Sequence, residues 1–194
     1  MNDLTHHLYT QACNNAWSNL RLLRACMQLS DVDFAARRTS FFPSLRATLN
    51  HNLTVDWFYV DALERALAGR ALNPDAARFF DPPEPFATCA PLAHAQRAVD
   101  TRLMACCAQL TDLTLLVAMP RGARVQREPV VRLLSHVFQH QVHHRGQAHA
   151  MLAGTHVPPP QLDEFFAVDD APRRALELPE LGLSEAGLWG PTQR

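Results

Sequence analysis

Lysine is entirely absent from this 194-residue chain, and all 18 basic residues are arginine. The acidic residues number 19, so the formal net charge is only −1. A protein that binds a nucleic-acid backbone normally carries an excess of positive charge on its surface. The near-neutral balance therefore predicts no nucleic-acid partner.

Long apolar runs and glycine-rich loops are also missing. The opening stretch, MNDLTHHLYTQACNNAWSNL, is too polar to act as a secretory signal or a membrane span. The 7 glycines form neither a phosphate-binding loop nor a dinucleotide fingerprint, and the sequence shows no Ser-His-Asp pattern. We therefore expect no membrane association and no nucleotide-dependent or serine-hydrolase chemistry.

Cysteine is scarce, and the 5 residues of this type include no Cys-x-x-Cys pair. They are Cys13, Cys26, Cys89, Cys106 and Cys107. An odd number without a secretory signal is typical of reduced thiols in a cytoplasmic protein. Neighbouring side chains on a helix diverge, so Cys106 and Cys107 are predicted to be packing thiols and not a disulfide.

The composition is that of an ordinary globular protein, with 47% hydrophobic and 19% charged residues. The length suits one domain with a single sizeable core. We predict a helical domain over residues 1–154 and a proline-rich tail over residues 155–194. Four apolar residues of the tail are expected to pack on the domain: Phe165, Phe166, Leu176 and Trp189.

Apolar residues recur every three or four positions in four stretches, which is the period of an α-helix. The first three predicted helices cover residues 3–27, 43–68 and 91–110, and Pro43 is placed in the first turn of the second. Glu128 and Pro129 lead into the fourth, which ends near Gly154. Between them we expect a proline-rich loop over 70–91 and a hairpin around Pro120-Arg121-Gly122. A short helix is predicted over 161–168. The fold class is therefore an all-α four-helix bundle with an irregular C-terminal tail.

Residues 131–154 hold five of the chain's ten histidines. Because a helix advances about 100° per residue, His140 and His144 lie about 40° apart on an otherwise apolar face. Two imidazoles one turn apart can hold a single divalent ion, although histidines bonded within a core or an interface would show the same spacing. His136 and His143 fall at the edge of this face, and His149 lies on nearly the opposite side.

A further histidine, His51, lies on the apolar stripe of the second helix. A lone histidine there is more often a core residue than a ligand. Bundles, however, build metal sites from inward side chains on facing helices. His51 with His140 and His144 is therefore the candidate metal site.

The chain also resembles the DinB family of DinB/YfiT-like metalloenzymes over about residues 5–153. The resemblance lies in Asn14 to Trp17, Leu49-Asn50-His51, Val55-Asp56-Trp57 and the run His140-Gln141-Val142-His143-His144-Arg145-Gly146-Gln147. It implies a dimeric four-helix bundle in which three histidines bind nickel or zinc and leave one coordination position open. By position in the motifs, the implied ligands are His51, His140 and His144.

Three functions remain open at this point. The first is a cytoplasmic metal-dependent enzyme acting on a small molecule, either a hydrolase or a transferase for a low-molecular-weight thiol. Its general base is not assigned, and the candidates are Asp56, Asp61, Tyr59 and His143. The second is a non-catalytic, metal-binding stress-response protein, in which a fourth ligand such as His136 closes a structural site. The third is a metal-free bundle whose histidines line a dimer interface and respond to pH.

Overall fold

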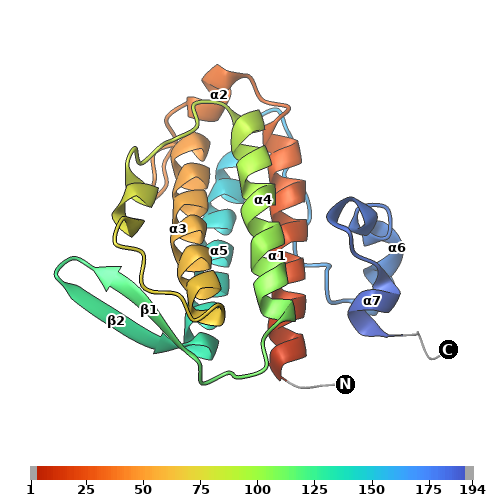
Figure 1. Ribbon diagram of the computed structural model, residues 1–194. Coiled ribbons are helices and arrows are strands. Elements are labelled where there is room, and N and C mark those ends of the chain that lie inside the picture. The colour runs from red at the N-terminus through yellow and green to blue at the C-terminus, as the bar shows by residue number, and fades with distance from the viewer. Residues whose placement is uncertain (1–3, 191–194) are drawn as a thin grey trace.

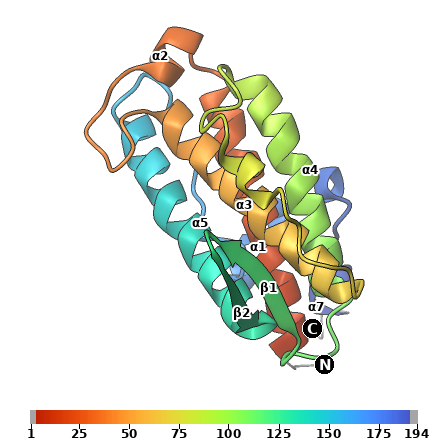
Figure 2. The same ribbon diagram turned by 60° about the vertical axis from the view of Figure 1, so that its left-hand side comes forward.

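The computed structural model describes residues 4–190, and four long helices form its body (Figures 1 and 2). They are α1 (Leu4–Cys26), α3 (Leu45–Leu67), α4 (Cys89–Ala108) and α5 (Val130–Ala153). Helix α1 packs against α4 and α5, and α3 packs against the same two helices, so α1 and α3 stand diagonally across the bundle. The predicted all-α bundle is confirmed, and α3 and α5 are neighbours.

The observed helix limits differ slightly from the predicted ones because caps decide where a helix begins. Ser44 is the N-cap of α3, and its side chain accepts a hydrogen bond from the Ala47 amide at 3.0 Å. Pro43 therefore precedes the helix, and its predicted place in the first turn is wrong. Helix α4 begins earlier than expected, at Cys89, so Pro91 lies within its first turn, where a missing N–H is tolerated.

Two short elements lie outside the four predicted long helices. Helix α2 (Asp31–Ala35) is capped by Ser30, whose side chain accepts a hydrogen bond from the Asp33 amide. A 3-10 helix, η1 (Ala76–Phe80), interrupts the predicted loop over 70–91. Neither is long enough to show a hydrophobic period, which is why the pattern did not predict them.

The predicted hairpin is present beside the ends of α3 and α5 (Figure 1). Strand β1 (Leu116–Arg121) pairs antiparallel with β2 (Arg124–Pro129), and Met119 faces Gln126 in the register. Gly122 adopts a φ of 62° in the turn, a conformation that favours glycine. Val117 and Met119 are buried, so one side of β1 closes that end of the core.

The tail contains four short elements within the described residues. They are η2 (Val168–Asp170), α6 (Ala171–Arg174), η3 (Leu178–Leu181) and α7 (Glu185–Trp189). The helix predicted over 161–168 is wrong, because residues 161–167 form turns and loop. The buried Arg174 guanidinium donates to the carbonyl oxygens of Glu164 and Ala167. The same carbonyls accept from the amides three residues later, Ala167 and Asp170, which is a turn pattern and not the four-residue spacing of an α-helix.

The tail lies along α1 (Figure 1). The Trp17 indole N–H donates to Glu177 at 2.7 Å, and the Arg21 guanidinium donates to the same carboxylate at 2.8 Å. Phe165 is fully buried, with its ring 5.7 Å from that of Trp17. Leu176, in contrast, is 83% exposed, so the prediction that it packs on the bundle is wrong. Among the helices of residues 4–190, none has the length and apolar character needed to cross a membrane.

Candidate metal centre

Three histidines meet between α3 and α5. His51 comes from α3, and His140 and His144 come from α5. One ring nitrogen of each lies within 4.8 Å of the others. Within residues 4–190, this is the single group of three or more His, Cys, Asp or Glu side chains that could hold a metal ion. The Nε2 atoms of His51 and His140 are 3.0 Å apart. The structure thus brings together the three residues selected from the sequence.

The three side chains fit a divalent ion. Imidazole nitrogens bound to zinc at about 2.0–2.1 Å would stand about 3.3 Å apart, close to the separation of His51 and His140. Burial lowers the pKa of His51 to about 4 and that of His140 to about 3, and neighbouring histidines add to both shifts. Metal ligands must be neutral imidazoles, so low pKa values keep these lone pairs available.

Hydrogen bonding selects the tautomer of the third histidine. Nδ1 of His144 lies 2.9 Å from the Gln147 side-chain oxygen, which can only accept, so Nδ1 carries the proton and Nε2 keeps its lone pair. The Gln147 amide donates in turn to Nε2 of His143 at 3.0 Å. Sequence reasoning missed Gln147 as the outer partner of a ligand. Its place one turn after His144 was the available signal.

The remaining histidines of α5 lie outside the cluster. His136 is exposed, with its ring 6.1 Å from that of His140 and 5.4 Å from that of Tyr59. His143 is exposed and reaches His144 through Gln147. His149 donates its Nε2 proton to the Pro160 carbonyl at 2.9 Å, away from the other imidazoles, as its helical position predicted.

Aromatic side chains from the segment before α3 cover part of the cluster. The Phe42 ring lies 4.4 Å from that of His51, and Phe41, which is 75% exposed, lies 6.1 Å from His144. Phe41 also borders a surface hollow of about 550 Å³ that includes Arg37 and Arg38. A second hollow of about 240 Å³ lies beside Tyr59 and His136 and is lined by Tyr59, Met119, Arg121, Gln126, Glu128, Arg132, Leu133 and His136. Arginines therefore occur in both hollows near the histidines.

A layer of polar side chains crosses the core of the bundle. Each long helix contributes two residues spaced one turn apart, and every member is at most 5% exposed. We call this set the polar layer: Asn15 and Asn19 on α1, Asn52 and Asp56 on α3, Gln96 and Asp100 on α4, and Gln141 and Arg145 on α5. Asp56, one of the candidate general bases, belongs to this layer and not to the metal centre.

Hydrogen bonds join the members of the polar layer across helices. Arg145 donates to the side-chain oxygens of Asn15 at 2.6 Å and Asn19 at 2.9 Å. Both asparagines donate in turn to Asp100. The Gln96 amide donates to Asp56 at 2.7 Å and to Asp100 at 3.1 Å. The two asparagines therefore connect the Arg145 guanidinium to Asp100, and Gln96 connects Asp100 to Asp56.

Burial shifts the pKa values of these charged groups toward their neutral forms. It raises the pKa of Asp56 to about 7, with a further contribution from Asp100, while the Gln96 and Gln141 amides oppose the rise. It raises the pKa of Asp100 to about 6 and lowers that of Arg145 to about 10. In the folded protein, Asp56 therefore keeps its proton until the pH rises to about 7.

Replacing Asp56 with asparagine is expected to change how stability depends on pH. Between 3.8, its ordinary pKa, and about 7, its folded pKa, the folded state keeps a proton that the unfolded state releases. This contribution to stability is complete below 3.8 and is lost as the pH rises to about 7. As the pH rises through that window, the free energy of unfolding of the variant should therefore increase relative to that of the wild type by about 1.4 kcal/mol per pH unit. Urea unfolding of metal-free protein would measure this difference. Parallel stability curves for the two proteins would contradict the assignment.

The other candidate bases differ in how near they lie to the cluster. Asp61 accepts hydrogen bonds from Arg65 and Asn73, and the Tyr59 hydroxyl accepts one from Arg121. The His143 ring, in contrast, lies 4.8 Å from that of His144. His143 is thus a candidate base whose ring contacts a histidine of the cluster.

The five cysteines are all free and buried, which agrees with their prediction as packing thiols. Burial raises the pKa of Cys106 to about 11 and the pKa values of Cys13 and Cys89 to about 12. Burial also raises the pKa values of Cys26 and Cys107. None of these thiols is set up to form a reactive thiolate.

Comparison with known proteins extends the resemblance seen in the sequence. A search of curated proteins gives no match. The DinB family model matches residues 1–175, which includes all four long helices and the first part of the tail. This match covers most of the chain, and we conclude that the protein belongs to the DinB family.

Proposed function

We propose that this protein is a metal-dependent enzyme that binds one nickel or zinc ion through His51, His140 and His144. The observation that carries the proposal is the number of ligands. Within residues 4–190 the cluster has three histidines and no fourth His, Cys, Asp or Glu. Structural zinc sites are normally closed by four protein ligands, whereas catalytic sites keep one position for water or substrate.

The proposed reaction is hydrolysis of a small molecule or transfer to a low-molecular-weight thiol. A divalent ion at this site would act as a Lewis acid that favours the deprotonated form of a water or thiol bound to it. The three imidazoles are neutral, so they leave the positive charge of the ion undiminished. Gln147 holds His144 in the tautomer that presents Nε2. His143 is a candidate to accept a proton, because its ring lies 4.8 Å from that of His144.

Two further features bear on the substrate, which we propose to be a small anion. The chain's own cysteines are buried with raised pKa values, so a thiol in the reaction would come from the substrate. Arg37 and Arg38 line the hollow that Phe41 shares, and guanidinium groups pair well with carboxylates. We further propose, from the free thiols and the family resemblance, a cytoplasmic homodimer.

The second candidate is a non-catalytic protein in which the ion stabilises the bundle. It would require His136 to close the site as a fourth ligand. The His136 ring lies 6.1 Å from that of His140 and contacts Tyr59, which favours the open site instead.

Metal analysis of wild-type protein and the His51→Ala variant, both purified without a histidine tag, tests the proposal. We expect about one ion per chain in the wild type and none in the variant, because a site between α3 and α5 needs both helices. Wild-type protein would then be screened for metal-dependent thiol transfer and hydrolysis. Wild-type protein that stays metal-free after reconstitution would refute the metal site. Chelation that lowers the melting temperature, without any activity in the screens, would favour the structural alternative.

A further inference from the structure

The polar layer is connected to the metal centre by the chain itself. Each of the three histidines is followed directly by a member of the layer: His51 by Asn52, His140 by Gln141, and His144 by Arg145. Successive side chains on a helix point about 100° apart, so each histidine faces the cluster while the next residue faces the bundle interior. Any shift of the polar layer along α3 or α5 would therefore move the ligands as well.

Stability alone does not account for the polar layer. Buried polar and charged groups usually stabilise a core less than apolar side chains of the same size. Moreover, four buried side-chain atoms on three adjoining members have no hydrogen bond of good geometry to the described protein: Asn52 Nδ2, Asn52 Oδ1, Asp56 Oδ1 and Gln141 Oε1. Such atoms need a buried water or carry a desolvation cost. The unmatched atoms lie in the half of the layer that borders the histidines.

One directional bond in this half links the two helices that carry the ligands. The Gln141 amide donates to the backbone carbonyl of Asn52 in a long hydrogen bond of 3.4 Å. This bond joins the residue after His140 to the residue after His51. Apolar packing resists sliding less strictly than a hydrogen bond does, because a hydrogen bond constrains both distance and angle. The Gln141 side chain therefore helps to fix the register of α3 against α5, whereas the Asn52 side chain makes no such bond within the described protein.

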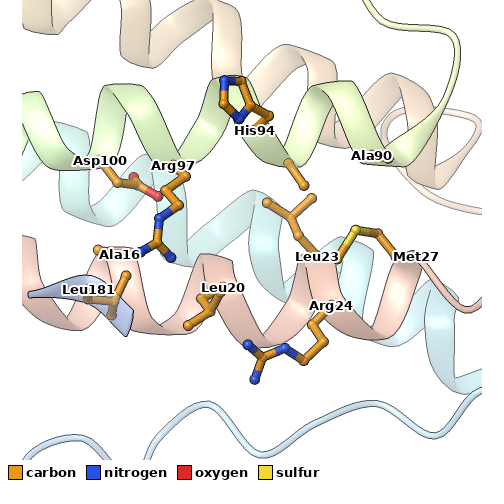
Figure 3. Close-up of a pocket in the computed structure, with 11 residues that line it drawn as sticks. Ala16, Leu20, Leu23, Arg24, Met27, Ala90, His94, Arg97, Asp100 and Leu181 are labelled. Atoms are coloured by element: carbon orange, nitrogen blue, oxygen red, sulfur yellow. The ribbon is translucent and has the colours of Figure 1, made fainter. Parts of the chain in front are cut away.

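The other half of the layer has the same polarity but no neighbouring ligands. Figure 3 shows Asp100 at the wall of a cavity of about 220 Å³ between α1 and α4, with Ala16, Leu20 and Leu23 opposite. Gln96 and Asn19 belong to this half, but Gln96 donates to Asp56 on α3, and Asn19 accepts from Arg145, the residue after His144. They are therefore bonded to the helices that carry the ligands. Asn52 is the matched control for Gln141, since it is also a nearly fully buried amide directly after a proposed ligand, and its side chain has no hydrogen bond within the described protein.

We propose that Gln141 is a positioning residue, which holds His51 and His140 at the separation that one metal ion requires. The inference rests on the proposed metal site and adds one residue that acts on it through the ligands. It predicts that metal affinity depends on the Gln141 hydrogen bond and not on the unbonded Asn52 amide.

The test compares Gln141→Leu with Asn52→Leu, with Gln141→Met in reserve if the leucine variant does not fold. Zinc affinity would be measured by chelator competition, the Co²⁺ absorption spectrum would report ligand geometry, and urea unfolding would report stability of the metal-free protein. We expect Gln141→Leu to lower zinc affinity about 10-fold, the lower end of what loss of a group bonded to a ligand costs, and to alter the Co²⁺ spectrum. Asn52→Leu should keep wild-type affinity and spectrum, because the backbone carbonyl that accepts from Gln141 remains.

Two outcomes would overturn the inference. One is wild-type affinity in Gln141→Leu. The other is an affinity loss that follows the loss of stability equally in Gln141→Leu and Asn52→Leu, which would make the layer merely structural. Wild-type protein that binds neither Zn²⁺ nor Co²⁺ would instead refute the proposed function, so the two failures are distinguishable.

Discussion

Replacing His140 with alanine is expected to abolish stoichiometric metal binding, whereas replacing His149 should leave one ion per chain. Nε2 of His140 lies 3.0 Å from Nε2 of His51, so both rings lose a shared ion when either is removed. The effect should exceed the roughly 100-fold loss that follows removal of an outer hydrogen bond. Metal analysis measures it directly. Thermal unfolding offers a second readout, because an ion at about 1,000 times its Kd adds about 4 kcal/mol of stability.

His149→Ala is a suitable control because it lies on the same helix and is also a histidine. Its Nε2 donates to the Pro160 carbonyl, so that nitrogen carries a proton and faces the tail. His144→Ala should behave like His140→Ala, since its ring lies 4.7 Å from that of His51. Metal retained in His140→Ala but lost in His149→Ala would show that the ligands are wrongly assigned. Metal retained in both would point to His136 as a replacement ligand.

The Arg145→Leu substitution should destabilise the fold by about 3–5 kcal/mol, the usual cost of leaving a buried charge without its partner. Arg145 is 5% exposed and is the cation that opposes Asp56 and Asp100 in the core. Its guanidinium also satisfies the side-chain oxygens of Asn15 and Asn19. Urea unfolding of metal-free protein would measure the loss.

A variant that removes the carboxylates together with the cation is the control for this prediction. Arg145→Leu combined with Asp56→Asn and Asp100→Asn leaves no net charge in the polar layer, and much of the lost stability should return. Acid should also lessen the defect of Arg145→Leu, because Asp56 and Asp100, with pKa values of about 7 and 6, become neutral as the pH falls. A defect of the same size at about pH 5 and about pH 8 would mean that lost packing, and not uncompensated charge, is the cause.

The sequence by itself determined the four long helices and the identity of the histidine cluster. Both follow from local geometry, because the 3.6-residue period places apolar side chains on one face and fixes which histidines share it. His140 and His144 could be paired and His149 set aside without any knowledge of the fold. His51 needed one further assumption, that inward histidines on facing helices meet.

Only the tertiary structure decided which partners the buried polar groups find. Arg145 bonds to Asn15 across 130 residues of sequence, and Asn15 bonds to Asp100 across 85. The sequence shows a pair of polar residues one turn apart on each long helix. It does not show how the four pairs bond to one another. The conformation of residues 161–167 likewise depends on Arg174 and on the packing of Phe165 against Trp17. Helical periodicity is local information, whereas a hydrogen bond between distant helices depends on how those helices are placed in space.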